Sequence, residues 1–219
     1  MMMQFLAIAV TVLGYLGARR LQRAFPSLHP LLIATPAVWL AWWGMSGDWQ
    51  TYKMGGEWIT FWLGPATVAL AVPLVKHIRA LAYLWKGVLL GVTVGCTVSL
   101  LSGWLVMQVA GGDDTLARSM LTKSVTTPFA VELTLTVGGV PALAALFSVV
   151  TGLIGAVMAR TLFKLAGIRD DWAIGIAVGT SSHAIGTASL PPEAAAQTAA
   201  SSLAMILAGL VTSLLLLPF

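Results

Sequence analysis

Long apolar stretches recur along the chain and are separated by short polar or basic segments. A helix needs about 20 consecutive apolar residues to cross the hydrocarbon core of a bilayer. Stretches near that length occupy residues 1–18, 30–45, 57–75, 83–109, 140–165, 172–190 and 194–219. Only 9% of the residues are charged, against about 25% in soluble domains. The sequence therefore predicts an all-α polytopic membrane protein with about seven or eight hydrophobic segments and excludes a soluble domain.

Basic residues gather in three clusters, within residues 19–23, 76–86 and 160–169. Such clusters mark the cytoplasmic ends of membrane spans, so the net charge of +4 indicates orientation and not nucleic-acid binding. We expect residues 1–18 to be a retained span, because they lack the basic leader and cleavage site of a signal peptide. Residues 47–56 are expected to be a short polar connection.

The segment 123–139, KSVTTPFAVELTLTVGG, combines apolar residues with features that interrupt a membrane helix. Proline at the start of a helix loses no hydrogen bond, so Thr127 is the expected N-cap and Pro128 the first helical residue. The free N–H groups and positive dipole of such a helix start can bind an anion. Glu132 follows about one turn later, where an ionisable residue at membrane depth suggests function.

A weaker version of this pattern starts at Gly64, where GPATVALAVPL resembles TPFAVELTLTV. Two interrupted helices at corresponding places in two halves indicate the binding site of a transporter. We therefore expect a single domain, 1–219, with an inverted repeat. Its parts are N-terminal spans in 1–56, repeat one in 57–110, repeat two in 116–167 and C-terminal segments in 168–219. The basic clusters favour a re-entrant hairpin entering from outside for the central stretch but a crossing segment after Gly64, so the topology of the interrupted segments stays open.

Three stretches are both irregular and polar: 64–67, 123–128 and 179–187. Irregular backbone at membrane depth is tolerated where it lines a wet cavity, so we expect the three stretches to converge. Helix starts, a lysine, hydroxyls and an imidazole would suit a small anion with hydroxyl or keto oxygens. The expected substrate-binding residues are Gly64, Pro65, Ala66, Thr67, Lys123, Ser124, Thr126, Thr127, Pro128, Gly179, Thr180, Ser182, Gly186 and Thr187.

Glu132 and His183 are the expected proton-coupling residues, since imidazole titrates near neutral pH. Each charged or titratable residue also has a structural alternative. Lys123 could extend to the membrane interface, Glu132 could pair with Lys123 or a backbone group, and His183 could be a hydrogen-bonded core residue. Single serines and threonines often bond their own helix backbone, so only the cluster of hydroxyls favours a site.

Enzymatic chemistry has little support in the sequence. Cys96 is the single cysteine and the three histidines are far apart, so no metal-ligand spacing occurs. No nucleophile–base set, phosphate-binding glycine loop or acid pair within the membrane is visible. We expect neither a metal nor a cofactor, and no enzyme activity.

The motifs KSVTTPFAVEL, GG-PAL-----TG--GA and GTSSHAIGTA resemble those of the LrgB/CidB family of bacterial membrane proteins. The same domain forms the C-terminal half of the plastidial glycolate/glycerate translocator. The resemblance runs from GPATVAL at Gly64 to SSLAMILAGL at Ser201 and is strongest between Lys123 and Thr187. Thr122, where the family usually has proline, and the SLPP sequence at 189–192 depart from the pattern.

The resemblance implies two functions. Bacterial members resemble antiholin-type modulators of murein hydrolase activity and autolysis, which act with a smaller holin-like partner of the LrgA/CidA type. Plastid and some bacterial relatives move glycolate, glycerate or pyruvate. The interrupted helices and polar lining favour a carboxylate carrier in the bacterial inner (plasma) membrane, with Glu132 and His183 as its expected proton-coupling residues. Its expected partners are the lipid bilayer, the small carboxylate, a second copy in a homodimer and the holin-like protein.

Overall fold

The computed structural model describes residues 2–25, 30–62, 65, 75, 79 and 83–218. Over these residues it contains nine helices and no strand. Four helices are long and apolar enough to cross a membrane: α1 (Met2–Ala24), α7 (Trp85–Val109), α10 (Pro141–Leu165) and α12 (Ala195–Leu216). The predicted all-helical membrane class is confirmed, although the described residues hold fewer long spans than the number of hydrophobic segments predicted.

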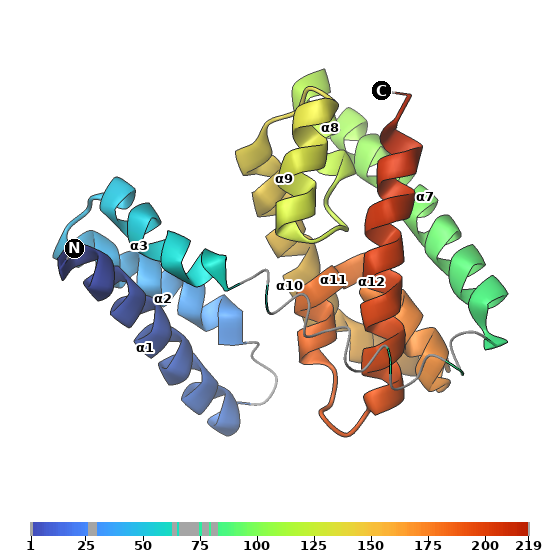
Figure 1. The fold of residues 1–219 in the computed structure, drawn as a ribbon, viewed down its shortest axis with the longest axis horizontal. Coiled ribbons are helices and arrows are strands. Elements are labelled where there is room, and N and C mark those ends of the chain that lie inside the picture. The colour runs from blue at the N-terminus through green and yellow to red at the C-terminus, as the bar shows by residue number, and fades with distance from the viewer. Residues whose placement is uncertain are drawn as a thin grey trace. The chain divides into compact units, whose positions relative to one another are not determined.

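The chain divides into two compact units, Met1–Leu70 and Ala71–Phe219. In the first unit, α1 packs against both α2 (Pro30–Met45) and α3 (Trp49–Phe61) (Figure 1). The side chain of Trp42 is fully buried between them, and its Nε1 donates a hydrogen bond to the Asp48 carbonyl at 2.9 Å.

The prediction of a polar connection over residues 47–56 is wrong, because α3 begins at Trp49. The Asp48 carboxylate caps this helix by accepting a hydrogen bond from the Gln50 N–H at 3.0 Å. Gly55 lets α3 approach α1 closely, since a Cβ there would lie 2.7 Å from the carbonyl oxygen of Gln4. Tertiary packing of this kind stabilises a helix whose composition alone is polar.

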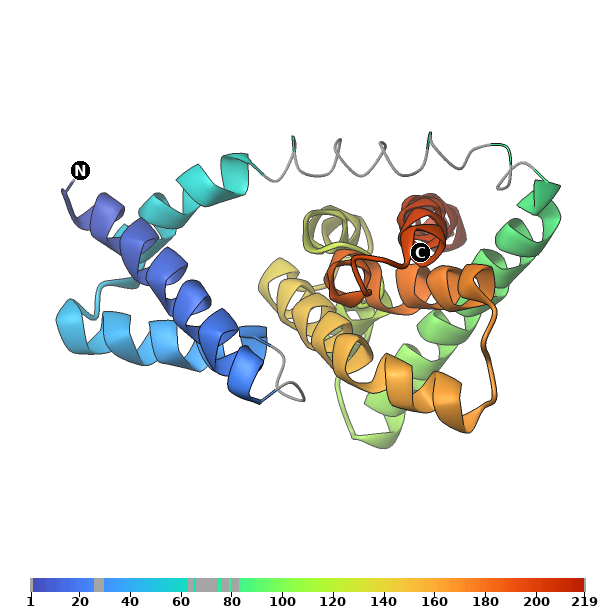
Figure 2. The same ribbon diagram turned by 90° about the horizontal axis from the view of Figure 1, so that it is seen from below.

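The second unit is a bundle of six helices in which α7, α11 and α12 pack on one another. Figure 2 shows α12 nearly end-on, with α7 along one side of it. Small residues allow this contact: Val88, Val92 and Cys96 of α7 form one buried cluster with Ala204 and Ala208 of α12. Close packing of small residues is the usual source of helix association in a membrane.

Two short helices, α8 (Asp114–Leu121) and α9 (Thr127–Thr136), form an antiparallel hairpin with the loop 122–126 between them. We call these residues the first hairpin. Arg118 Nη1 donates to the Val137 carbonyl at 2.9 Å at its open end, and the hydroxyls of Thr122, which follows α8, and Thr134, in the last turn of α9, meet at 2.7 Å. At about 1.5 Å per residue, neither helix is long enough for the ~30 Å of hydrocarbon. The hairpin therefore enters the bundle part-way and returns to the same end.

The glycine pair that follows α9 closes the first hairpin at its open end. Gly138 has a φ of 74°, which favours glycine because other residues rarely adopt it. Gly139 packs against α8, where a Cβ would lie 2.9 Å from the Ser119 nitrogen. The Ser119 hydroxyl then accepts a hydrogen bond from the Val140 N–H at 2.8 Å, next to the start of α10.

A second hairpin is formed within α11 (Asp171–Ser189), which folds back at His183. His183 has φ 40° and ψ −137°, so the helical path is interrupted there. Residues 171–182 and 184–189 form its two arms, and a Cβ on Gly186 would lie only 3.0 Å from Val178. Eight residues apart in one straight helix, these positions would be separated by about 12 Å. Figure 1 shows the second arm returning to the end of the bundle at which α12 begins.

The two hairpins enter from opposite ends of the bundle. The first lies where α7 ends and α10 begins, and the second lies at the other end, together with Lys86 near the start of α7 and Lys164 near the end of α10 (Figure 1). Under the positive-inside rule, the first hairpin enters from outside and the second from the cytoplasm. This arrangement agrees with the re-entrant geometry predicted for the central stretch.

Candidate functional site

The tips of the two hairpins meet at Ser148, a fully buried residue of α10. The Ser148 hydroxyl donates to the Val125 carbonyl of the first tip at 2.8 Å and lies 3.3 Å from the Thr127 hydroxyl. The Ser148 carbonyl oxygen lies 3.0 Å from Nε2 of His183, at the tip of the second hairpin. One residue of a spanning helix therefore connects two interrupted segments that are far apart in the sequence.

Lys123 lies at the same level, on the tip of the first hairpin. Its Nζ donates hydrogen bonds to the carbonyl and hydroxyl oxygens of Ser99, at 2.8 and 2.6 Å. Ser99 lies near the middle of α7, a helix of 25 residues, and so about 15 Å from its C-terminal end. The ammonium group therefore remains inside the bundle, which excludes the alternative that Lys123 extends to the membrane interface.

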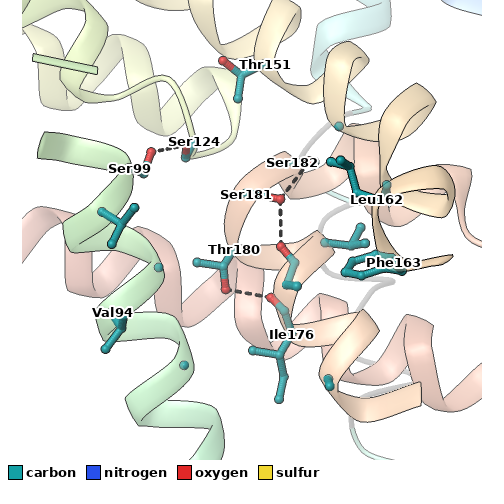
Figure 3. A pocket seen from close by; sticks show the side chains of 18 of the residues that line it. Val94, Ser99, Ser124, Thr151, Leu162, Phe163, Ile176, Thr180, Ser181 and Ser182 are labelled. Atoms are coloured by element: carbon teal, nitrogen blue, oxygen red, sulfur yellow. Dashed lines mark hydrogen bonds between the residues drawn. The ribbon is translucent and has the colours of Figure 1, made fainter. Parts of the chain in front are cut away.

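A cavity of about 760 Å³ lies between α7, α10, the first arm of α11 and the tip of the first hairpin. Its polar residues come from all four elements. Figure 3 shows Ser99 and Ser124, whose hydroxyls are 2.5 Å apart, on one side, and Ser181 and Ser182 across from them. The polar lining residues are Ser99, Ser102, Lys123, Ser124, Thr151, Thr180, Ser181 and Ser182.

The charge of Lys123 is not balanced by a carboxylate in the described part of the chain. The one ion pair found there joins Arg118 to Asp114 at the open end of the first hairpin, at 2.8 Å. Glu132 is exposed on α9 and does not line the cavity. An unbalanced ammonium in a cavity at membrane depth attracts an anion, because an unpaired charge in such surroundings is costly.

The structure brings four of the predicted binding residues to the cavity: Lys123, Ser124, Thr180 and Ser182. Of the predicted group at 64–67, Gly64, Ala66 and Thr67 lie outside the described residues. Pro65 is described, and its side chain is exposed. The convergence of the 64–67 group with the others stays a prediction.

The start of α9 differs from the prediction by one residue. The N-cap is Thr126 and the helix begins at Thr127, so Pro128 is the second helical residue. No side-chain hydrogen bond caps the first N–H groups of this helix. Because Thr127 lies against Ser148, the positive end of the helix faces the region where the hairpin tips meet. The predicted break in the apolar zone is present, and Thr127 contacts Ser148.

Three further predicted residues hold the second hairpin together. Gly179 lies against the Ser201 backbone of α12, and Gly186 lies against Ser182 in the opposite arm. The Thr187 hydroxyl donates to the His183 carbonyl at 2.7 Å and lies 2.7 Å from the Ser201 hydroxyl. Their observed contacts are therefore structural and shape the tip beside the cavity.

His183 is 1% exposed and its ring packs against Gly152, where a Cβ would lie 2.8 Å from Cε1. Its Nε2 lies 3.0 Å from the Ser148 carbonyl, while Nδ1 has no hydrogen-bond partner among the described residues. With Nε2–H as donor, Nδ1 is a bare acceptor. His183 is thus a buried residue at the hairpin tip, and it does not line the cavity itself.

The sequence reasoning missed several cavity residues that lie within regular helices. Ser99 and Ser102 are on α7 and Thr151 is on α10. Ser181 of α11 lies within the stretch 179–187 that was expected to converge on the cavity, but it was not among the expected substrate-binding residues. Ser148, which connects the tips, was missed for the same reason. The available signal was the spacing of Ser99 and Ser102, which places two hydroxyls on one face of an otherwise apolar helix.

Sequence comparisons identify related proteins along nearly the whole chain. The family model described as "LrgB-like family" matches residues 11–219. The uncharacterized protein YxaC of Bacillus subtilis (strain 168) is 36% identical over 182 residues, covering 82% of this chain and 79% of that protein. No solved structure matches.

Other relatives have descriptive names. The holin-like protein CidB of Staphylococcus epidermidis is 27% identical over 213 residues, covering 96% of this chain and 93% of that protein. The antiholin-like protein LrgB of Bacillus mycoides is 31% identical over 163 residues, covering 74% and 71%. With its apolar spanning helices and this match over residues 11–219, the chain is a multi-pass membrane protein that belongs to the LrgB-like family.

Proposed function

We propose that this protein is a membrane carrier of small carboxylates of the glycolate, glycerate or pyruvate type. The observation that carries the proposal is the position of Lys123. Its ammonium contacts the middle of the spanning helix α7 and lies beside a cavity lined by hydroxyls. No described carboxylate neutralises it. A monocarboxylate would neutralise the charge and accept a charge-assisted hydrogen bond from Nζ.

The hydroxyl groups around Lys123 suit the remaining oxygens of such a substrate. Ser99 and Ser124 lie next to the ammonium, and Ser181 and Ser182 lie across the cavity (Figure 3). A hydroxyl can both donate and accept a hydrogen bond, so the same residues can bind a keto or a hydroxy group. This lining explains how one cavity would accept either class of acid.

The paired hairpins support transport over static binding. Secondary transporters place their substrate near the bilayer midplane, between interrupted helices of two oppositely oriented halves. Here two hairpins enter from opposite ends and meet at Ser148. Opening one hairpin at a time would give the cavity access to one side of the membrane at a time.

We also propose that two residues couple transport to protons. One is His183, whose buried Nδ1 has no partner among the described residues, and the other is Glu132, the one charged residue of α9. We further propose a homodimer with one cavity in each protomer, located in the bacterial inner membrane.

A second function is favoured by the names of the relatives, CidB being holin-like and LrgB antiholin-like. In this alternative the protein modulates murein hydrolase activity and autolysis together with a small holin-like membrane partner. An altered carboxylate flux could produce the same cellular effect, so the two functions need a direct test.

Uptake by the purified full-length chain in vesicles separates the two functions. We expect it to accumulate labelled pyruvate or glycolate faster than protein-free vesicles do, without any partner protein, and an imposed proton gradient to increase accumulation. Uptake equal to that of protein-free vesicles for both acids would reject the carrier. An autolysis change in cells that persists in a transport-inactive variant would then support the modulator.

A further inference from the structure

The cavity has two chemically different ends. Ser99, Ser124 and Thr151 lie toward one end, near Lys123, whereas Val94 and Ile176 lie toward the other (Figure 3). Glycines of α7 also line the cavity at that end, and the large side chains of Leu162 and Phe163 of α10 line it on the side opposite Val94 (Figure 3). We call this end the apolar arm; it is formed by Gly87, Gly91, Val94, Leu162, Phe163 and Ile176.

The cavity as a whole is larger than a two- or three-carbon acid needs. The cavity volume of about 760 Å³ equals that of about 25 water molecules at ~30 Å³ each, and such an acid is only a few waters in size. Gly91 and Ser99 are eight residues apart on α7, so the arm extends about 12 Å from the polar end.

The arm contains neither charge nor hydroxyl among its six defining residues, so it offers water few hydrogen bonds. Water there is readily displaced by apolar groups, because apolar surface gains free energy when it is removed from water. The polar end offers a single cation, Lys123, with no described carboxylate beside it. The ligand that matches both ends has one negative charge and an apolar remainder.

Two glycines make the arm wide at its α7 wall. A Cβ on Gly87 would meet nothing within 4 Å, and one on Gly91 would meet only Ile176 Cγ2 at 3.4 Å, an ordinary contact. Both positions therefore have room for a side chain, unlike Gly95, where a Cβ would lie 2.7 Å from Thr180. Both glycines are exposed, so the space beside them is not required by helix packing and is open to a ligand or to a lipid chain.

We propose that the apolar arm binds the aliphatic chain of a monocarboxylate whose carboxylate lies at Lys123, so that the preferred substrates are longer than three carbons. This inference rests on the proposed carrier function and adds a substrate class to it. Gly91 and Phe163 are then specificity-determining residues. Gly91 sets the width of the arm on the α7 side, and Phe163 forms its wall on the α10 side.

A homologous series of 2-keto acids tests the inference. Pyruvate and its homologues lengthened by one, two and three methylenes are titrated into the purified full chain in nanodiscs and are used as competitors of labelled pyruvate uptake. We expect affinity to rise by up to about fourfold per methylene. In Gly91→Leu the rise should disappear, so that the ratio of the affinities for the longest acid and for pyruvate falls to about one.

Gly17→Leu is the matched control, since Gly17 on α1 also has open space and lies outside the cavity. In this variant the affinity should still rise with the length of the acid. Equal affinity along the series, with pyruvate uptake intact, overturns the inference and leaves the carrier. An equal loss of affinity for all four acids in Gly91→Leu also overturns it, because the arm would then be a path by which every acid reaches Lys123. Rising affinity without uptake of any acid supports the arm but rejects the carrier, and absence of both binding and uptake rejects both.

Discussion

Replacing Lys123 with methionine is expected to abolish carboxylate uptake and to leave the protein folded. Removing one partner of a buried ionic contact costs about 3–5 kcal/mol, which corresponds to a loss of at least about a hundredfold in affinity. Methionine is similar in length and apolar, so it needs no counter-charge in the cavity beside Ser99. The thermal unfolding midpoint should therefore be unchanged or higher. Vesicle uptake and a thermal unfolding curve measure the two quantities.

Two further variants control for charge and for lysine itself. Lys123→Arg keeps the positive charge and should retain part of the uptake, with an altered affinity because the guanidinium is larger and planar. Lys164→Met removes an exposed lysine of α10 outside the cavity and should leave uptake unchanged. Full uptake with wild-type affinity in Lys123→Met would contradict the assignment of Lys123 as the anion-binding group.

Gly179→Val is expected to have the largest effect on stability. A Cβ at Gly179 would overlap the Ser201 backbone of α12, and at Gly175 it would overlap the Gln197 carbonyl. Backbone atoms cannot rotate away, so the two helices must separate. Overpacking costs about 1–3 kcal/mol and occasionally more; at ~3 kcal/mol the unfolding midpoint falls by about 6–12 °C in a chain of this size.

Gly56→Val is the matched control, because Gly56 lies in α3 with nothing within 4 Å of its would-be Cβ. Both substitutions place valine in a helix and so carry the same propensity cost. Only Gly179→Val should lower the unfolding midpoint strongly. Equal midpoints for the two variants would mean that α11 and α12 do not touch at Gly179.

Much of the fold is predictable because membrane spans follow from composition and length. The predicted limits of the stretches that became α7, α10 and α12 lie within three residues of the observed helix ends. The turn after α9 was visible as Gly138 and Gly139. By contrast, α3 was missed, since its stability comes from the cap at Asp48 and the contact of Gly55 with α1.

The fold-back of α11 was not predictable from local sequence. The reversal occurs at His183, a residue with φ 40°, where glycine would be the usual signal. Contacts distant in the sequence hold it there: the ring lies against Gly152, and Nε2 faces the Ser148 carbonyl. Such a conformation is kept when the surrounding structure determines it.

The charged residue of the candidate site was predicted from the sequence, but several of the residues that line the cavity were not. Lys123 and Ser124 stood out because they lie beside a proline break, where polar residues at membrane depth are unusual. Ser99 and Ser181 lie inside helices, where a hydroxyl can bond its own backbone and carries little signal. Only the position of α7 beside the hairpin tip reveals that Ser99 binds Lys123.

Cysteine labelling at Ser181 tests the central claim most directly, which is that a wet anion-binding cavity lies at the middle of the bundle. Ser181→Cys is made in a Cys96→Ala background, and the purified chain in vesicles is treated with a water-soluble charged thiol reagent. Leu101→Cys, exposed on α7 but not lining the cavity, is the control. We predict rapid labelling at position 181, slowed by pyruvate or a longer 2-keto acid, and no labelling at position 101. Absence of labelling at 181, or labelling that no carboxylate slows, would contradict the account.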